Sequence, residues 1–441
     1  MPGNKNQYYQ NSVVVVGATP ISLATALVLA KNRFSVTILV RNTEAIEALK
    51  RNRTDFHESA LDMELNAALR EGRLSLAASS KKHLQTGALI ILAGEPSESG
   101  TSKLRLSTFE RLAGWIGEWE RDIPAVVVIR AAMPLGFTSM FRRLLADTPH
   151  GDKVRIVVSP DFARPGSTYE DTSRPKAVYV GAEDGFSGSL VANIFRKVYP
   201  KSVKIVRTSS EAAELIGLAP SLYIAQKHSI TDEIAEYART KGLDFAAIKS
   251  AMENDPRIDG ELPAPGLGFA GPQLLNHCRA LKSREAGNRF TFETAKTALY
   301  VNDLIIDGLI YRLRKRIGRL TGYKIAVFGI TAFPGSADCR GSRAVVLARD
   351  LRQRGAEVAL FDPMLKGRDK VEPGNLPLQS DEESAVKGAS ALVIGTPHRR
   401  FGALKPAELA KLMKEPLIMD YFRFLKRHRW ETAGFTFIDR G

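Results

Sequence analysis

A strand–turn–helix–strand pattern occurs twice in this chain, and it limits the fold more than any other feature of the sequence. The first copy begins with the β-branched run Val13–Val16, passes Gly17, continues as a helical pattern over Ile21–Lys31 and ends in a strand over Ser35–Val40. The second copy consists of the strand Lys324–Gly329, a helix near Ser342–Arg354 and the strand Glu357–Asp362. Apolar β-branched runs that alternate with helical periodicity are typical of parallel sheets covered by helices. Each copy therefore predicts the start of a doubly wound sheet.

Between the two copies the pattern changes from strands to long helices. Apolar residues recur at helical spacing from Ser209 to Leu320, most clearly over Glu211–Lys241 and Phe292–Leu320. Further strands are predicted at Ala88–Ala93, Ala125–Arg130, Lys153–Val158, Ala177–Val180 and Ala391–Ile394. We therefore expect an α/β protein with two Rossmann-like doubly wound domains, over residues 1–205 and 321–441, joined by a central helical region over residues 206–320.

Charge and cysteine content limit the setting and the partners. The 441 residues carry a formal net charge of +15, which favours anionic partners such as nucleotide sugars, dinucleotides or polyanions. Basic clusters such as Arg312–Arg316 are ordinarily solvated helix faces, and no nucleic-acid-binding motif is visible, so no nucleic-acid partner is predicted. Two cysteines, Cys278 and Cys339, make neither a disulfide framework nor a zinc motif, so we expect no metal and a reducing, cytoplasmic setting. No apolar run approaches the roughly 20 residues of a membrane span.

The Pro/Gly-rich segment Pro265–Leu281 is the most informative motif of the chain. It resembles the active-site loop of the UDP-glucose/GDP-mannose dehydrogenase family, which usually reads Gly-Phe-Gly-Gly-Ser-Cys-Phe-Pro-Lys-Asp. Other segments are similar to motifs of the same family in the same order: Ser159–Ser167, Ala213–Glu233, Asp255–Ile258, Pro334–Ser342 and Phe361–Met364. Each motif is weak by itself, but their order and spacing extend the resemblance over nearly the whole chain.

The resemblance implies a chemistry and a role for each domain. Members of the family oxidise the C6 alcohol of a nucleotide sugar twice with two NAD, often for polysaccharide biosynthesis, and pass through a cysteine thioester. A thiolate suits this step because it is both a good nucleophile and a good leaving group. A lysine and an asparagine stabilise the oxyanion. The resemblance further implies an N-terminal dinucleotide-binding domain, a central dimerisation region that carries the substrate loop, and a C-terminal nucleotide-sugar-binding domain.

Most positions that match the family's catalytic residues hold other residue types. Gln273 stands at the place of the nucleophilic cysteine, and its amide is not a nucleophile. Asn276 and His277 stand at the places of the loop lysine and aspartate, and Asp161 stands at the place of a glutamate. The remaining replacements are Gly217 for the oxyanion lysine, Ser221 for its asparagine partner and Ala132 for a threonine. Cys278, five residues past the nucleophile position, is expected to be a small core residue rather than a substitute nucleophile.

The cofactor turn is also altered. The family's Gly-x-Gly-x-x-Gly reads Gly17-Ala18-Thr19-Pro20-Ile21-Ser22, so that Thr19 crowds the place where backbone normally approaches a pyrophosphate. Val40 replaces the acidic residue that binds the ribose, and Arg41 follows it, which favours NADP slightly over NAD. The candidate cofactor residues are Gly17, Thr19, Pro20, Ile21, Arg41 and Pro96. The absence of any cofactor stays an alternative, with Arg41 an ordinary solvated residue.

The nucleotide-sugar side is better kept. The resemblance assigns contacts with the sugar nucleotide to Phe162, Arg257, Phe269, Gly271 and Arg340, with an arginine supplied across the interface of a homodimer. Guanidinium forks suit diphosphates because they make paired, charge-assisted hydrogen bonds. The alternative is that these arginines serve only the dimer interface.

The sequence thus predicts a divergent nucleotide-sugar dehydrogenase homologue that does not perform the cysteine-dependent oxidation of UDP-glucose to UDP-glucuronate. It would keep binding of NAD(P), of a nucleotide sugar, or of both, as an oxidoreductase with altered redox chemistry. Two other interpretations stay open. The chain could be a pseudoenzyme that acts as a scaffold or regulator of an active paralogue, or a binding module for anionic ligands.

Overall fold

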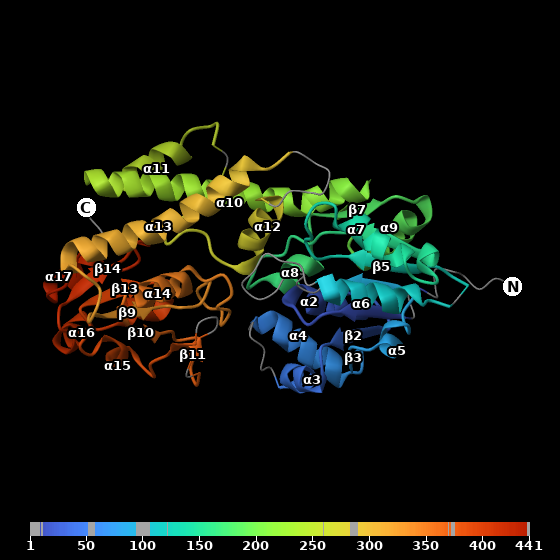
Figure 1. Cartoon of the computed structure of the whole chain (residues 1–441), viewed down its shortest axis with the longest axis horizontal. Coiled ribbons are helices and arrows are strands. Elements are labelled where there is room, and N and C mark those ends of the chain that lie inside the picture. Colours follow the sequence, from blue (N-terminus) through green and yellow to red (C-terminus); the bar gives the residue numbers. More distant parts are fainter. Residues whose placement is uncertain are drawn as a thin grey trace. The chain divides into compact units, whose positions relative to one another are not determined.

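The fold comes from a computed structural model that describes residues 9, 12–51, 58–93, 106–120, 122–258, 260–282, 290–368, 370–371 and 375–438. The chain divides into two compact units. The first unit comprises Met1–Pro220 and Ser283–Thr291, and the second comprises Ser221–Lys282 and Phe292–Gly441 (Figure 1).

The first unit is built on an eight-stranded sheet in the order β3-β2-β1-β4-β5-β6-β7-β8. All neighbouring strands are parallel except β6 and β7. Its strands are β1 Val13–Val16, β2 Val36–Val40, β3 Leu74–Ala78, β4 Leu89–Leu92, β5 Ala125–Ile129, β6 Val154–Val158, β7 Ala177–Ala182 and β8 Lys204–Thr208. The central strands are buried almost throughout, because helices cover both faces of a parallel sheet and leave no polar side.

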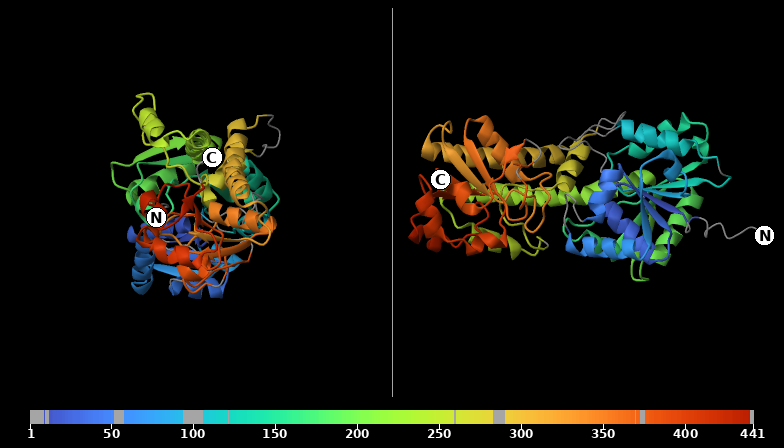
Figure 2. Two further views of the ribbon diagram at one scale, coloured as in Figure 1. Left: turned by 90° about the vertical axis from the view of Figure 1, so that its left-hand side faces the viewer. Right: turned by 90° about the horizontal axis from the view of Figure 1, so that it is seen from below.

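Helices alternate with these strands along the chain. They are α2 Pro20–Lys31, α3 Thr43–Lys50, α4 Ser59–Arg70, α5 Lys81–Leu84, α6 Leu106–Gly117, α7 Phe137–Ala146, α8 Thr168–Ser173 and α9 Gly185–Val198, with a 3₁₀ turn at Gly151–Lys153. Helix α2 is buried from Ser22 to Ala30, because its own residues are small or aliphatic on every side of the helix. Figure 2 shows the helices lying against the sheet.

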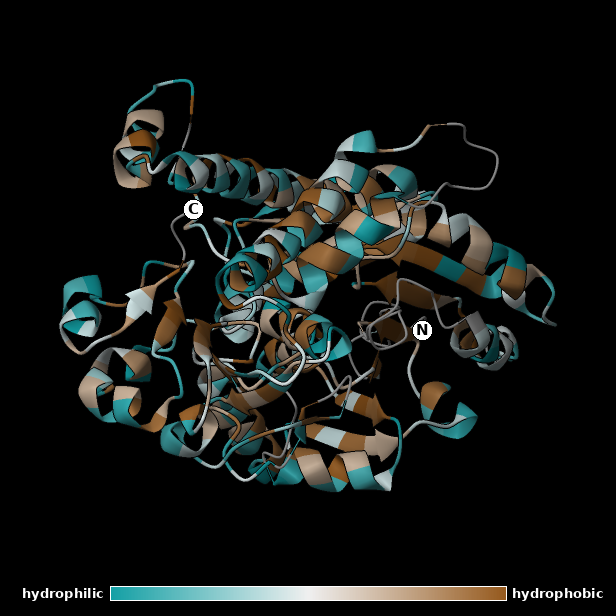
Figure 3. Ribbon diagram, turned by 60° about the vertical axis from the view of Figure 1, so that its left-hand side comes forward, coloured by the Kyte–Doolittle hydropathy of each residue, from teal (hydrophilic) through white to brown (hydrophobic). Residues whose placement is uncertain are grey.

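The second unit holds a five-stranded parallel sheet in the order β10-β9-β13-β14-β15. Its strands are β9 Lys324–Phe328, β10 Glu357–Phe361, β13 Ala391–Ile394, β14 Leu417–Met419 and β15 Thr436–Phe437, and β11 Lys370–Val371 pairs with β12 Leu376–Pro377 in a short hairpin. The strands of the sheets are mostly hydrophobic, whereas the helices mix both kinds of residue (Figure 3).

Two long helices, α10 and α13 (Glu293–Ile317), precede this second sheet in the chain. Helix α10, Ser210–Lys241, has residues in both units: those up to Pro220 belong to the first unit, and those from Ser221 belong to the second. The remaining helices are α11 Phe245–Glu253, α12 Pro272–Lys282, α14 Arg343–Gln353, α15 Glu382–Val386, α16 Pro406–Leu412 and α17 Arg427–Thr432, with a 3₁₀ turn at Arg399–Ala403.

In each sheet, strands that follow one another along the chain are added first on one side of a central strand and then on its other side. In the first sheet β2 and β4 flank β1, and in the second β10 and β13 flank β9. In open parallel sheets ligands bind outside the carboxyl ends of the strands at such a switch point. The fold therefore directs attention to the segments that follow β1, β4, β9 and β13.

The prediction of an α/β protein with two Rossmann-like sheets is confirmed, and each strand that the sequence predicted is present within a few residues. Two strands of the first sheet, β3 and β8, were not predicted. In β8 most side chains are exposed or half-buried, so the segment lacks the apolar run by which the other strands were recognised. The division at residues 205 and 320 stays a prediction.

Candidate functional site

The turn between β1 and α2 begins at a glycine with positive φ and contains an internal hydrogen-bond network. Gly17 has φ +115°, a conformation that glycine adopts at little cost. Thr19 is the N-cap of α2, and its Oγ1 accepts a hydrogen bond from the Ser22 backbone N–H at 3.3 Å. The Ser22 Oγ in turn accepts from the Thr19 backbone N–H at 2.7 Å, which completes a capping box.

This capping box competes with a phosphate for the same donors. The N-terminus of a helix attracts phosphate because its first backbone N–H groups have no partner in the helix. Here the N–H groups of Thr19 and Ser22 already bond to each other's side chains. The Thr19 hydroxyl also donates a hydrogen bond to the Ala93 carbonyl at 2.8 Å. Because Ala93 directly follows β4, this bond connects the turn after β1 to the end of the neighbouring strand at the switch point.

The residue that follows β2 is a basic residue, Arg41, and not an acidic one. Val40 is 1% exposed, so its side chain belongs to the core. The next residue, Arg41, is exposed, and its guanidinium forms no hydrogen bond or ion pair within the part of the chain that the structure describes. Asn42 caps α3 by accepting from the Ala45 N–H at 3.0 Å. Pro96, the remaining candidate for the cofactor site, lies outside the described residues.

Asp161 is held in a buried ion pair. Its carboxylate bonds to the guanidinium of Arg130, and both side chains are at least 96% buried. It also accepts a hydrogen bond from the Ala163 N–H at 2.7 Å and lies 3.4 Å from the Thr172 hydroxyl, which donates to it. A buried charge that loses its partner is costly, so the pair holds the ends of β5 and β6 together. Beside it, the ring of Phe162 is 39% exposed.

Gly217 leaves no space for a longer side chain. A Cβ atom at this position on α10 would lie 2.9 Å from the Cβ of Pro160, closer than such atoms approach in proteins. Because the obstacle is a rigid proline ring, it cannot swing aside as the tip of a flexible side chain can. The position that the resemblance assigns to the oxyanion lysine therefore serves as a contact between helix and loop.

In the second unit, the loop before α12 packs against its neighbours through glycines. A Cβ on Gly268, where φ is +94°, would lie 2.1 Å from the Asn302 Oδ1. A Cβ on Gly271, where φ is +88°, would lie 2.4 Å from the Phe333 ring. These two glycines are thus required by close packing and by positive φ, whether or not a ligand is present.

Three buried polar side chains hold the backbone of this loop; we call Asp232, Asn302 and Arg343 the loop clamp. Asp232 on α10 accepts from the Gly266 N–H at 3.0 Å. Asn302 on α13 accepts from the Phe269 N–H at 2.7 Å and donates to the Phe269 carbonyl at 3.3 Å. Arg343 on α14 donates to the Leu267 carbonyl at 3.2 Å. Burial raises the pKa of Asp232 to about 6.

Helix α12 carries Gln273, Asn276 and His277, which the resemblance places at catalytic positions of the family. Gln273, in its first turn, and Asn276 are both half-buried. His277 is 6% exposed, and its Nδ1 lies 2.7 Å from the hydroxyl of Ser221 on α10. Burial lowers the pKa of His277 to about 4, so its ring is neutral at neutral pH.

Cys278 is a core residue, as predicted. Its side chain is fully buried beside Ala225, Phe269 and Leu275. Burial raises the pKa of its thiol to about 12, which keeps it protonated and unreactive. Phe269, a candidate substrate residue, is only 2% exposed and lies in the same cluster, so its ring contributes to the core.

The two candidate substrate arginines share one local arrangement. The Asp255 carboxylate accepts from the backbone N–H of Arg257 and from its guanidinium, both at 2.9 Å. Asp338 accepts from Arg340 in the same way, again at 2.9 Å from both donors. Each aspartate thereby fixes the direction of the guanidinium two residues later. Arg257 is exposed, whereas the side chain of Arg340 is 31% exposed.

Comparison with known proteins decides the family. Residues 11–199 match the NAD binding domain of the UDP-glucose/GDP-mannose dehydrogenase family, residues 211–304 match its central domain, and residues 326–427 match its UDP binding domain. The chain belongs to the UDP-glucose/GDP-mannose dehydrogenase family. The resemblance inferred from the motifs is thus confirmed, and with it the presence of a dinucleotide-binding domain and a UDP-binding domain.

Individual relatives of this family member align over nearly their whole length. A UDP-glucose 6-dehydrogenase of Rhizobium meliloti is 26% identical over 97% of this chain and 99% of its own. The UDP-glucose 6-dehydrogenase YwqF of Bacillus subtilis is 26% identical over 93% of this chain and 92% of its own. A solved UDP-glucose dehydrogenase of Pyrobaculum islandicum shares the fold, with a TM-score of 0.83, 24% identity, and coverage of 97% of this chain and 98% of its own.

The fold brings only some of the candidate residues together. Within the second unit, Gln273, Asn276 and His277 share α12, and His277 pairs with Ser221. Gly17, Thr19, Arg41 and Asp161 belong to the first unit. No helix in the described part of the chain is long and apolar enough to cross a membrane.

Sequence reasoning missed Arg130 and the loop clamp. Arg130 directly follows the apolar strand β5, and a charged residue at the buried end of a strand usually needs a counter-ion nearby. Asn302 interrupts the apolar positions Val301, Ile305 and Ile306 of α13, and a polar residue on a buried face needs a hydrogen-bond partner. These two signals were present, but neither identifies the partner.

The buried, neutral His277 predicts a specific pH dependence of stability. Its pKa is about 4 when folded and about 6.5 when unfolded, so the unfolded state takes up the proton first and stability is lost as pH falls through this window. From pH 7 to pH 5 this should lower the free energy of unfolding by on the order of 2 kcal/mol. In the His277→Asn variant the loss over this range, measured by urea unfolding, should be smaller by that amount.

Asp232 supplies a matched control, because its contribution to the pH dependence of stability has the opposite sign to that of His277. Its raised pKa means that acidification from pH 7 to pH 5 favours the folded state, so Asp232→Asn should lose more stability than the wild type over the same range. Equal pH dependence in the wild type and the His277 variant would contradict the burial of a neutral imidazole.

Proposed function

We propose that this family member binds an NAD(P) dinucleotide and a nucleotide sugar but does not perform the cysteine-dependent four-electron oxidation. The observation that carries the proposal is the packing of Gly217 on Pro160, with 2.9 Å between the place of a Cβ and the proline ring. It leaves no room for a lysine at the oxyanion position. The glutamine at position 273 supplies no nucleophile.

His277, Cys278 and Asp161 do not replace the missing groups. An oxyanion requires a preorganised donor or a positive charge. His277 is neutral at neutral pH because burial lowers its pKa to about 4. The Cys278 thiol is fully buried. Asp161 already neutralises Arg130, and we propose that it serves the fold and not proton transfer.

Restoring the cysteine alone should not restore oxidation to the acid. We expect that neither the wild type nor Gln273→Cys converts UDP-glucose and NAD(P)⁺ to UDP-glucuronate, because the lysine is missing as well. Removal of one oxyanion donor costs roughly 10²–10³ in rate. The measurement combines the absorbance of the reduced dinucleotide with mass spectrometry of the sugar nucleotide.

Gln273→Ser provides the control for this experiment, since it changes the same position without adding a thiol. Calorimetric titration of all three proteins with UDP-glucose and with each dinucleotide shows whether the ligands still bind. Formation of UDP-glucuronate by Gln273→Cys would show that the oxyanion group is intact and would overturn the proposal.

We further propose that the dinucleotide is preferentially NADP. Support comes from Arg41, which is exposed and without a hydrogen-bonding partner among the described residues, at the end of the second strand of the sheet. An arginine at this place can accommodate the 2′-phosphate. Arg257 and Arg340, each oriented by an aspartate, are the proposed contacts for the nucleotide sugar.

Arg41→Ala should weaken NADP binding by about tenfold or more, because a charge-assisted hydrogen bond contributes about 1.5–3 kcal/mol. Binding of NAD should change little. Arg70→Ala, an exposed arginine on α4, is the matched control and should affect neither dinucleotide. Fluorescence titration with NAD and NADP measures both affinities, and an equal loss for the two would refute the role of Arg41.

One observation favours a second candidate, a pseudoenzyme that acts as a scaffold or regulator. The capping box of Thr19 and Ser22 occupies two N–H groups of the cofactor turn. If neither dinucleotide binds at millimolar concentration, this second candidate replaces the first. We also propose a cytoplasmic setting for this protein, because its two cysteines, Cys278 and Cys339, form no disulfide.

We propose that the chain forms a homodimer through α10 and α13. On α10, the aromatic rings of Tyr223 and Tyr237 are 68% and 61% exposed. On α13, Tyr300 and Tyr311 are 65% and 66% exposed. Exposed tyrosines spaced along helix faces are typical of interfaces, because they combine a large apolar ring with a hydroxyl that tolerates water.

Replacing two of these rings by charge should separate the dimer. We expect Tyr237→Asp/Tyr311→Asp to sediment as a monomer at micromolar concentration, and the wild type as a dimer. Analytical ultracentrifugation gives both masses, and the circular dichroism of the variant should stay unchanged because both side chains are exposed. A wild type that sediments as a monomer would contradict the proposed homodimer.

A further inference from the structure

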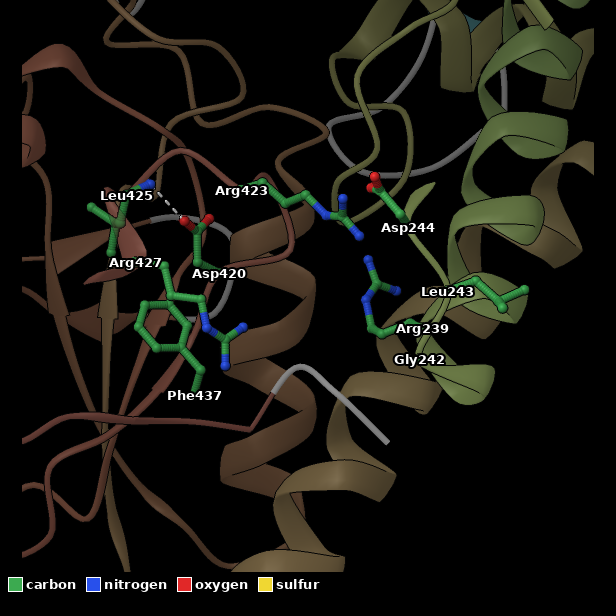
Figure 4. A pocket seen from close by; sticks show the side chains of 9 residues that line it. All are labelled: Arg239, Gly242, Leu243, Asp244, Asp420, Arg423, Leu425, Arg427 and Phe437. Atoms are coloured by element: carbon green, nitrogen blue, oxygen red, sulfur yellow. Dashed lines mark hydrogen bonds between the residues drawn. The ribbon is translucent and has the colours of Figure 1, made fainter. Parts of the chain in front are cut away.

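A cavity of about 360 Å³ lies in the second unit, between the end of α10 and the segment that follows β14. Three arginines line it: Arg239 from α10, and Arg423 and Arg427 from the segment after β14. Leu243 and Phe437 supply apolar wall. Figure 4 shows the guanidinium groups of Arg239 and Arg423 extending toward each other from opposite sides of this cavity.

Arg423 is the distinctive residue of this cavity. Its φ is +52°, a left-handed conformation that is unfavourable for a residue with a Cβ. The turn around it is fixed by the Asp420 backbone carbonyl, which accepts from the Arg423 N–H at 3.2 Å, and by the Asp420 carboxylate, which accepts from the Leu425 N–H at 2.7 Å. A strained residue in a well-held turn is a reason to look for function.

The guanidinium of Arg423 belongs to an exposed residue and is open to water. It forms no hydrogen bond or ion pair with any residue that the structure describes, and lies 5.6 Å from the centre of the Phe245 ring. Arginine normally satisfies its five donors with carboxylates, carbonyls or water. In this cavity an aromatic face supports the group and leaves its fork available.

The other two arginines are held in place by aromatic rings and ion pairs. The Arg239 guanidinium lies 4.0 Å from the centre of the Tyr421 ring and bonds to Glu236. The Arg427 guanidinium lies 4.5 Å from the centre of the Phe437 ring and bonds to Glu431 at 2.6 Å. These supports reduce the freedom that each side chain would lose on binding a ligand.

Two carboxylates also line the cavity, and both accept backbone hydrogen bonds. Asp244 caps α11 through the Ala246 N–H at 2.9 Å, and Asp420 accepts from Leu425. Together with Glu236 and Glu431, which pair with Arg239 and Arg427, these two aspartates balance the charge of the three arginines. Among the three arginines, Arg423 is the one whose fork forms no ion pair with a described residue, and it faces Arg239 across the cavity (Figure 4).

We propose that this cavity binds a small molecule through a phosphate group. Guanidinium forks match the oxygens of phosphate with paired, charge-assisted hydrogen bonds. The phosphate lies between Arg239 and Arg423, with Arg427 beside it. Because about 360 Å³ exceeds the space that one phosphate needs, the rest of the ligand packs against Leu243 and Phe437.

The test uses the full-length protein and inorganic phosphate as the probe. Calorimetric titration at constant ionic strength, adjusted with chloride, should show saturable binding in the millimolar range or tighter. Arg423→Gly should weaken it at least about tenfold, because one forked, charge-assisted contact is lost. Arg316→Ala, which removes an exposed arginine of α13 outside the cavity, should bind phosphate as the wild type does.

Thermal unfolding separates a binding role from a structural role of Arg423. Glycine adopts positive φ without strain, so Arg423→Gly should unfold at the same temperature as the wild type or higher in the absence of phosphate. Phosphate should raise the unfolding temperature of the wild type and of Arg316→Ala, and should raise that of Arg423→Gly less at the same phosphate concentration. The proposal is wrong if the wild type does not bind phosphate, or if Arg423→Gly binds it equally well.

Discussion

The second unit depends on how its glycine-rich loop is held. Asp232, Asn302 and Arg343 reach the loop backbone from three different helices, and each is at least 95% buried. Buried backbone N–H and carbonyl groups must find partners, and an irregular loop offers none of its own. The loop clamp provides these partners and so allows a segment without secondary structure to pass through the interior. The position of α12, and with it of Gln273 and His277, follows from this clamp.

The same constraint fixes the shape of the loop without reference to its chemistry. Gly268 and Gly271 are fixed by the backbone that they touch and by positive φ, not by a ligand. The nucleophile position carries no such restriction, because Gln273 is half-buried in the first turn of α12. Packing can therefore preserve the frame of this loop whichever residue stands at position 273. In the first unit, Gly217 shows the reverse case, since contact with Pro160 now excludes a lysine.

Much of this architecture could be predicted, because the strands are apolar runs and the motifs occur in the family's order. The assignment of Gln273, Asn276 and His277 to catalytic positions of the family stays a prediction. The pairing of Arg130 with Asp161 could not be predicted, since the two residues are 31 apart and many carboxylates could serve as partner. The interpretation of Thr19 as a crowding residue was incomplete for a similar reason. A hydroxyl can obstruct a ligand or cap a helix, and only the geometry around Ser22 distinguishes the two.

The burial of Cys278 has a consequence for how this protein withstands oxidants. A catalytic cysteine must be accessible and readily deprotonated, and these same properties expose it to peroxide and to alkylating agents. This loop has a glutamine at that position, and the nearest thiol along the chain is enclosed and stays protonated at any physiological pH. Under the proposed function the loop works without an accessible thiol, so oxidation of a single sulfur atom would leave its binding intact.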